Sequence, residues 1–193
     1  MTVPGTFDTS ARELIHAGLQ NLDEARSLFR QLSASGFDAA RCGLLLDALQ
    51  HVCDPDVALR NLVDIVNAQV SQGRALDDIM PDDTAFRQLV AVLGVSDAMG
   101  KLMRFRPDLV QAAATDHCNS HLYNHDQRRA HVLESVGADP NDRMSPTATM
   151  DLADAATALR RTYRNQLAAI IAQDTMSDDP IALQPRISSE LSD

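Results

Sequence analysis

The sequence contains no tryptophan, and aromatic residues make up only 4% of its 193 residues. A core with so few rings must be filled mainly by aliphatic side chains, and hydrophobic residues, at 45% of the chain, can supply them. Alanine, leucine and methionine favour helices, whereas β-branched and aromatic residues favour strands. The composition therefore predicts a helical protein with one sizeable core or two small ones.

Cysteine is also scarce. Cys42, Cys53 and Cys118 are an odd number without paired spacing, which argues against a disulfide framework and fits a reducing compartment. Cys42 and Cys53 lie in leucine-rich surroundings, so we expect both to be buried, inert thiols. No apolar run approaches the roughly 20 residues that span a bilayer, and no signal peptide is recognisable at the start. These features predict a cytoplasmic protein without a membrane segment.

Basic residues are few: the chain has 27 acidic and 17 basic residues, and its formal net charge is −10. Such a surface repels phosphate backbones and anionic lipid surfaces. We therefore expect neither nucleic acid nor a membrane as a partner.

Helical spacing of apolar residues runs along most of the chain, and no strand alternation or hairpin signal occurs. Asp54 and Pro55 are typical of a helix start, Gly94 is expected to end a helix in the left-handed conformation, and Gly137 is expected to stop another. The expected helices cover 10–33, 38–52, a segment from 55 to the polar turn at 71–78, 82–93, 97–105, a segment from 107, part of 116–136, and 148–174. The predicted fold is all-α, an irregular bundle of about seven or eight helices without a sheet.

The expected domain organisation follows from these helices. Residues 1–176 are predicted to form a helical amino-terminal domain, with a loop at 138–147. Residues 177–193 are predicted to be a linker and the beginning of a further helix that is cut off.

Sequence motifs of known catalytic sites are missing: there is no Gly-rich phosphate loop, no Gly-x-Ser-x-Gly and no Cys-x-x-Cys. Asp54-Pro55-Asp56 offers two carboxylates of the kind that hold magnesium in nucleotidyl transfer. That chemistry also needs a strand and a Gly-Ser turn, which are not found here, so we interpret the motif as a helix start. No catalytic, cofactor-binding or metal-binding residue is assigned.

His117, His121 and His125 recur every fourth residue, with Cys118 beside them. On a helix the three imidazoles would share one face and could bind zinc or nickel. Asparagine and aspartate residues weaken the helix here, so a solvated histidine-rich surface is the favoured interpretation. The alternative function that this motif leaves open is a free-standing helical protein-interaction or metal-binding module.

Arg160, Arg161 and Arg164 form a basic edge on the last long helix. Salt bridges to nearby acidic residues are the expected role on an amphipathic helix. A phosphate or an acidic partner surface is the alternative.

Several stretches, in a fixed order, together resemble one protein family. They are Asp54–Leu62, Phe86–Ser96 continuing through 102–107, Val136–Pro140, Ala158–Leu167 followed by 170–174, and Glu190–Asp193. Their pattern is similar to the amino-terminal helical region of glutamine synthetase adenylyltransferase. The Tyr163-Arg164 helix contributes most to the resemblance.

The resemblance implies a much longer bifunctional enzyme that regulates nitrogen assimilation. Family members carry two nucleotidyltransferase domains, one adding AMP to a tyrosine of glutamine synthetase and the other removing it. The full-length family uses ATP and magnesium, and its implied partners are glutamine synthetase, a PII-type signalling protein and the downstream catalytic domain of the same polypeptide.

The family's catalytic motif, a Gly-Ser turn followed by an Asp-x-Asp strand, is expected downstream of the matched stretches. The chain alone is therefore expected to be inactive and to serve as a scaffold or substrate-docking region. Met99-Gly100-Lys101-Leu102 is similar to a stretch that leads into the family's catalytic core, but we interpret it as part of an amphipathic helix.

Overall fold

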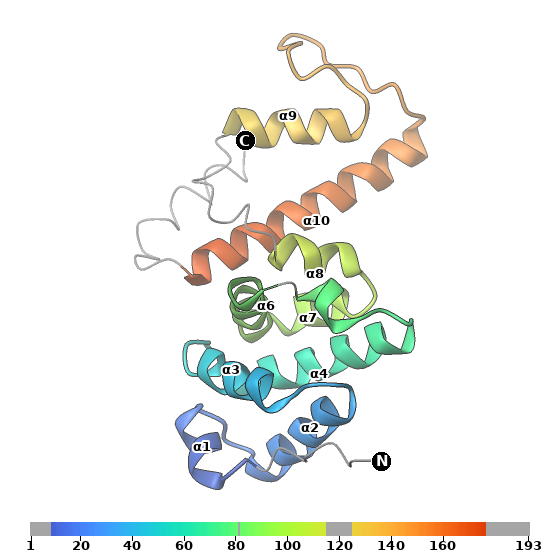
Figure 1. Ribbon diagram of the computed structural model, residues 1–193. Helices are drawn as coiled ribbons and strands as arrows, with labels where there is room; N and C mark the ends of the chain where they lie inside the picture. Colours follow the sequence, from blue (N-terminus) through green and yellow to red (C-terminus); the bar gives the residue numbers. More distant parts are fainter. Residues whose placement is uncertain (1–8, 81, 115–124, 177–193) are drawn as a thin grey trace. The chain divides into compact units, whose positions relative to one another are not determined.

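The computed structural model describes residues 9–80, 82–114 and 125–176 (Figure 1). Every regular element within these ranges is an α-helix, which confirms the predicted all-α class. The chain divides into two compact units, Met1–Ala114 (unit 1) and Thr115–Asp193 (unit 2). The predicted domain boundary at 176 stays a prediction, since 177–193 lies outside the described ranges.

The helices of unit 1 are α1 (Ala11–His16), α2 (Leu22–Ala34), α3 (Ala39–Leu49), α4 (Pro55–Ser71), α5 (Leu76–Ile79), α6 (Asp83–Val95), α7 (Asp97–Met103) and α8 (Pro107–Ala114). Those of unit 2 are α9 (His125–Ser135) and α10 (Leu152–Met176). No helix within the described ranges is long and apolar enough to cross a membrane.

The single helix expected over 10–33 is wrong, because the chain turns between α1 and α2. Gly18 adopts a φ of 81°, which is accessible to glycine at little cost. Asn21 then caps α2, accepting a hydrogen bond from the backbone N–H of Glu24 at 3.3 Å. The apolar spacing continues across the turn, which is why periodicity alone predicted one helix.

Two further differences concern short segments. The polar turn expected at 71–78 contains the start of the short helix α5. Gly94 is not a left-handed cap but a residue within α6, where a Cβ atom would lie 2.8 Å from Val52 Cβ. Close packing against Val52 therefore explains this glycine, and α6 ends one residue later at Val95.

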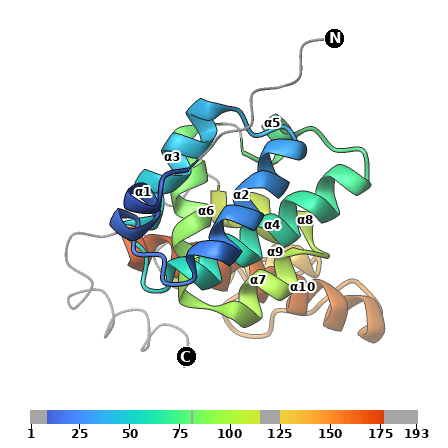
Figure 2. The ribbon, with the colours of Figure 1, turned by 90° about the horizontal axis from the view of Figure 1, so that it is seen from below.

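The core of unit 1 is built around α4 and α6, which pack against each other. Figure 1 shows α4 between α2 and α7, and Figure 2 shows α6 alongside α3 and α4. An ion pair between Arg87 of α6 and Asp47 of α3 holds the pKa of that carboxyl below its ordinary value. The largest fully buried side chains of this core are Phe29, Leu14, Leu32, Leu45, Leu49, Leu59, Leu62, Ile65, Leu89, Leu93, Met103 and Leu109.

Unit 2 is smaller and consists of α9, α10 and the loop between them. Val136 and Ala138 at the start of the loop pack against Ala155 of α10. Gly137 has a φ of 73°, so the prediction that it stops the helix is confirmed. The predicted loop at 138–147 is confirmed as well, since regular structure resumes only at Leu152.

Candidate functional site

The paired carboxylates of Asp54 and Asp56 hold backbone groups of the chain itself. Asp54 Oδ1 accepts a hydrogen bond from the N–H of Val57 at 3.0 Å and caps α4, which begins at Pro55. The predicted helix start is thus confirmed. Asp56 Oδ2 accepts a hydrogen bond from the N–H of Gln20 at 3.0 Å, and its Oδ1 accepts one from Asn21 at 3.3 Å. Asp56, near the start of α4, therefore holds the connection between α1 and α2 against that end of α4.

Removal of Asp56 is expected to loosen that connection. Asp56→Ala leaves two backbone N–H groups without their acceptor, and we expect it to lower the free energy of unfolding by about 1–3 kcal/mol. The cap variant Asp54→Ala should cost about 1 kcal/mol. Amide hydrogen exchange distinguishes the two, because only Asp56→Ala should speed exchange at Gln20 and Asn21. Unchanged exchange at both amides would contradict the assigned role.

The Met99-Gly100-Lys101-Leu102 stretch lies in α7, as its interpretation as a helix predicted. Ser96 caps this helix by accepting a hydrogen bond from Met99 N–H at 3.2 Å. Gly100 faces Asn61 of α4 so closely that a Cβ atom would overlap the amide group of Asn61. Asn61 is buried and donates a hydrogen bond to the Leu93 carbonyl at 3.3 Å. The glycine is thus explained by the contact of α4 with α7.

Histidine metal binding stays a prediction. His117, Cys118 and His121 lie outside the described residues, and His125 is described only as the first residue of α9. Among the side chains that the structure describes, no three His, Cys, Asp or Glu residues gather as a metal site.

The two cysteines expected to be buried differ from each other. Cys42 is fully buried in α3, and burial raises the pKa of its thiol, which keeps it protonated and unreactive at neutral pH. The prediction for Cys53 is wrong, because this residue is exposed. It follows the end of α3 at Leu49, in the connection to α4, and so lies outside the leucine-rich helix face.

Two of the three arginines of α10, Arg160 and Arg164, differ from the expected salt-bridge pattern. Arg160 and Arg161 are exposed and Arg164 is half-buried. Arg160 and Arg164 form no ion pair with any residue of the described ranges. For these two residues the alternative interpretation, a phosphate or an acidic partner surface, stays a prediction.

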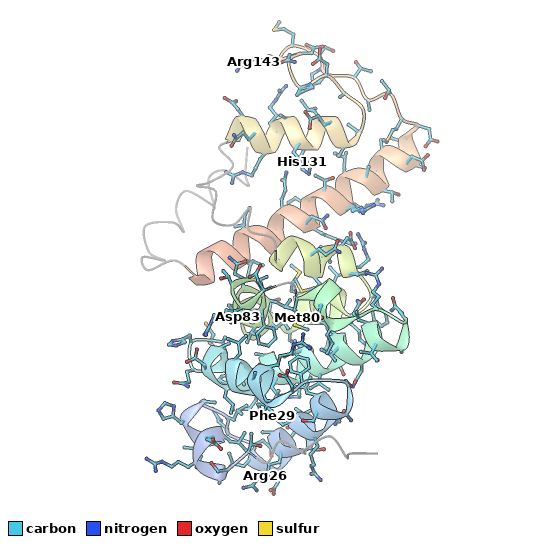
Figure 3. The ribbon with its side chains drawn as sticks, viewed as in Figure 1. Arg26, Phe29, Met80, Asp83, His131 and Arg143 are labelled. Carbon is cyan, nitrogen blue, oxygen red and sulfur yellow. The ribbon has the colours of Figure 1, made fainter. Side chains whose placement is uncertain are left out.

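A small cavity in unit 1 was not predicted from the sequence. Its volume is about 130 Å³, well below the 300–1,000 Å³ of typical ligand pockets. Arg41 and Asp77 form an ion pair in its wall, and Met80 and Asp83, labelled in Figure 3, are among its lining residues. Asp82 is already engaged as the cap of α6. The lining residues are Phe37, Arg41, Leu44, Asp77, Met80, Asp82, Asp83 and Phe86.

The loop of unit 2 is held by charged side chains that the sequence did not single out. Arg129 donates hydrogen bonds to the carbonyls of Pro140 and Asp142, each at 3.0 Å. Asp142 Oδ1 accepts hydrogen bonds from the N–H groups of Met144 and Ser145, each at 3.0 Å. The two- and three-residue spacing from Asp142 to Met144 and Ser145 is typical of an Asx turn, so this turn could have been predicted from the sequence. The contact of Arg129 with the loop has no such sequence signal.

The Asp142 turn predicts a pH dependence. Backbone hydrogen bonds from Ser145 and Met144 lower the pKa of Asp142 below its ordinary value of 3.8. A lowered pKa in the folded state means that the turn's contribution to stability is complete above the ordinary pKa. That contribution is lost as the pH falls through the folded-state pKa. An NMR titration should show the Met144 and Ser145 amide shifts moving with a midpoint below pH 3.8. A midpoint at or above that value, or an unchanged profile in Asp142→Asn, would contradict the assignment.

Within the described residues the fold is all-helical, and Asp54, Asp56, Arg129 and Asp142 are charged side chains that hold its turns and helix ends. Comparison with known proteins then shows which proteins the chain is similar to. The chain is 62% identical over 187 residues, 97% of its length, to proteins of two strains of Bifidobacterium longum, DJO10A and NCC 2705. These are named bifunctional glutamine synthetase adenylyltransferase/adenylyl-removing enzyme.

More distant relatives carry the same name. A protein of Corynebacterium efficiens is 33% identical over 168 residues, which is 70% of this chain and 15% of that protein. A protein of Leifsonia xyli is 28% identical over 181 residues, which is 93% of this chain and 17% of that protein. No family model matches the chain, and no solved structure does.

The resemblance predicted from the sequence is confirmed by these comparisons. The chain is similar, over nearly its whole length, to part of glutamine synthetase adenylyltransferases. It spans 17% of the length of the Bifidobacterium longum relatives.

Proposed function

We propose that this chain acts as a non-catalytic helical part of a bifunctional enzyme that adds AMP to glutamine synthetase and removes it. The observation that supports this most directly is the 62% identity that extends over 97% of the chain. Identity at this level over so long a stretch includes buried helix contacts and exposed positions alike. A shared helical fold alone would not require the exposed positions to agree.

The engaged side chains support a structural role rather than a chemical one. Asp54 and Asp56, the one carboxylate pair that the sequence singled out, both bind backbone N–H groups. Nucleotidyl transfer needs carboxylates that are free to coordinate magnesium. In the proposed enzyme, ATP and magnesium are therefore used by another part of the polypeptide, and this part positions that domain or the substrate.

The proposed partners follow from the same assignment. They are glutamine synthetase, a PII-type signalling protein and the catalytic domain of the same polypeptide, in the cytoplasm. Regulation of nitrogen metabolism would then be the process to which the chain contributes.

A chimeric enzyme tests this proposal. The matched segment of the Bifidobacterium longum enzyme is replaced with this chain, and the addition and the removal of AMP from glutamine synthetase are both assayed. We expect both activities to stay within about ten-fold of the natural enzyme, since the helix contacts are preserved. A matched chimera that carries Phe29→Ala, which removes a buried core side chain, should lose activity on warming. A soluble, folded chimera without either activity would overturn the proposal.

A further inference from the structure

Between Ala155 and Gln166, helix α10 turns one side toward the core of unit 2. Ala155 and Ala158 on this side pack against the cluster of Val136 and Ala138. Thr162, one turn further along, is buried. Gln166 continues the same side and donates a hydrogen bond to the Arg128 carbonyl at 3.3 Å. The spacing of these residues, three or four apart, defines the buried face of this part of α10, and further along the helix Ala168 and Ile170 are buried as well.

A second side of α10 carries large apolar side chains in contact with solvent. Leu152, Leu159 and Tyr163 are 87%, 40% and 53% exposed. Their spacing of seven and four residues places them along one line of the helix, which we call the α10 stripe. Single exposed apolar residues are ordinary, but three aligned on one helix are typical of a surface that another chain covers.

The α10 stripe has a basic border. Arg160 and Arg164 each follow a stripe residue by one position and lie one turn apart, so they flank the stripe on the same side. Neither pairs with an acidic residue of the described ranges, although the chain as a whole carries a net charge of −10. Guanidinium groups that lack carboxylate partners in so acidic a chain favour an acidic occupant from elsewhere.

A second copy of the chain fits this surface poorly. A symmetric contact through the α10 stripe would place the same arginines of both copies along one interface, and like charges repel. Three side chains also supply much less than the roughly 800 Å² per partner of a stable interface. A nucleic acid is disfavoured as well, because the net charge of the chain is −10.

We propose that the α10 stripe, with Arg160 and Arg164, docks an apolar segment bordered by Asp and Glu from the remaining polypeptide of the enzyme. This inference rests on the proposed function, and it names the surface through which the part acts. The Bifidobacterium longum relatives, of whose length this chain spans 17%, have ample polypeptide to provide such a segment.

Photocrosslinking in the chimeric enzyme tests the inference. Tyr163 is replaced by p-benzoylphenylalanine, and the enzyme is irradiated. The crosslinks that this residue forms are located by mass spectrometry. We expect crosslinks within one polypeptide, to a segment outside the matched region that is rich in Asp and Glu. The double variant Arg160→Glu with Arg164→Glu should reduce their yield by about ten-fold, because it reverses the attraction. Arg143→Glu is the matched control, since Arg143 is also exposed but lies in the loop of unit 2, and it should leave the yield unchanged.

Other outcomes overturn the inference. Crosslinks between two polypeptides would indicate a second copy, and crosslinks confined to the matched region would place the occupant within this chain. The absence of crosslinks, or a yield that the double variant does not reduce, would also refute it. The activity of the chimera separates this result from the proposed function: an active chimera with any of these outcomes leaves the proposed function intact, whereas an inactive one removes it.

Discussion

Replacing Phe29 with alanine is expected to lower the free energy of unfolding of unit 1 by about 3–5 kcal/mol. Phe29 is fully buried on α2, the helix that packs against α4 (Figure 3). Truncation removes the whole ring from the core and leaves a cavity that its neighbours can fill only in part. Such a loss is a large share of the roughly 5–15 kcal/mol that stabilises a domain of this size. Urea unfolding followed by circular dichroism measures the change.

Phe105 provides the matched control for Phe29. Phe105 is 71% exposed, and the Arg104 guanidinium lies 5.4 Å from the centre of its ring. We expect Phe105→Ala to cost less than about 1 kcal/mol. Equal effects of the two substitutions would contradict the burial assigned to Phe29.

The second large effect is expected at Gly100. A Cβ atom there would overlap the Asn61 amide and lie 2.7 Å from Asn61 Oδ1. Gly100→Ala must therefore push α7 away from α4 or displace Asn61 from its hydrogen bond to Leu93. We expect a loss of about 3 kcal/mol in the free energy of unfolding, since overpacking and a broken buried hydrogen bond act together. The measurement is again urea unfolding.

Two further variants establish the cause at Gly100. Gly43 lies in α3 with nothing within 4 Å of a built Cβ, so Gly43→Ala should stabilise the protein by about 0.5–1 kcal/mol through helix propensity. In the background of Asn61→Ala, the cost of Gly100→Ala should fall by more than about 1 kcal/mol, because the overlapping group is gone. Additive costs would show that Asn61 is not the obstacle.

Helix ends were predictable from the sequence where capping residues mark them. Asp54 and Pro55 began α4, and Gly137 ended a helix, both by local backbone rules. The break at Gly18 was missed because the apolar spacing crosses it without interruption. Gly94 was misassigned because a glycine required for close helix packing looks, in sequence, the same as one required for a turn.

The long-range contacts could not be predicted from periodicity. Asp56 binds the backbone of Gln20, and Arg129 binds the carbonyl of Pro140. Such pairings depend on how helices fold back on one another, and hydrophobic spacing carries no information about that. The family resemblance was accessible because it depended on the order of several stretches rather than on any single contact.

In the proposed function, these residues support nucleotidyl transfer without performing it. Release of ADP from adenylylated glutamine synthetase in the presence of phosphate tests it most directly, with the purified 193-residue chain compared with the chimeric enzyme at equal concentration. We predict release by the chimera and none above background by the chain. Phosphate-dependent release of ADP by the chain alone would contradict the account.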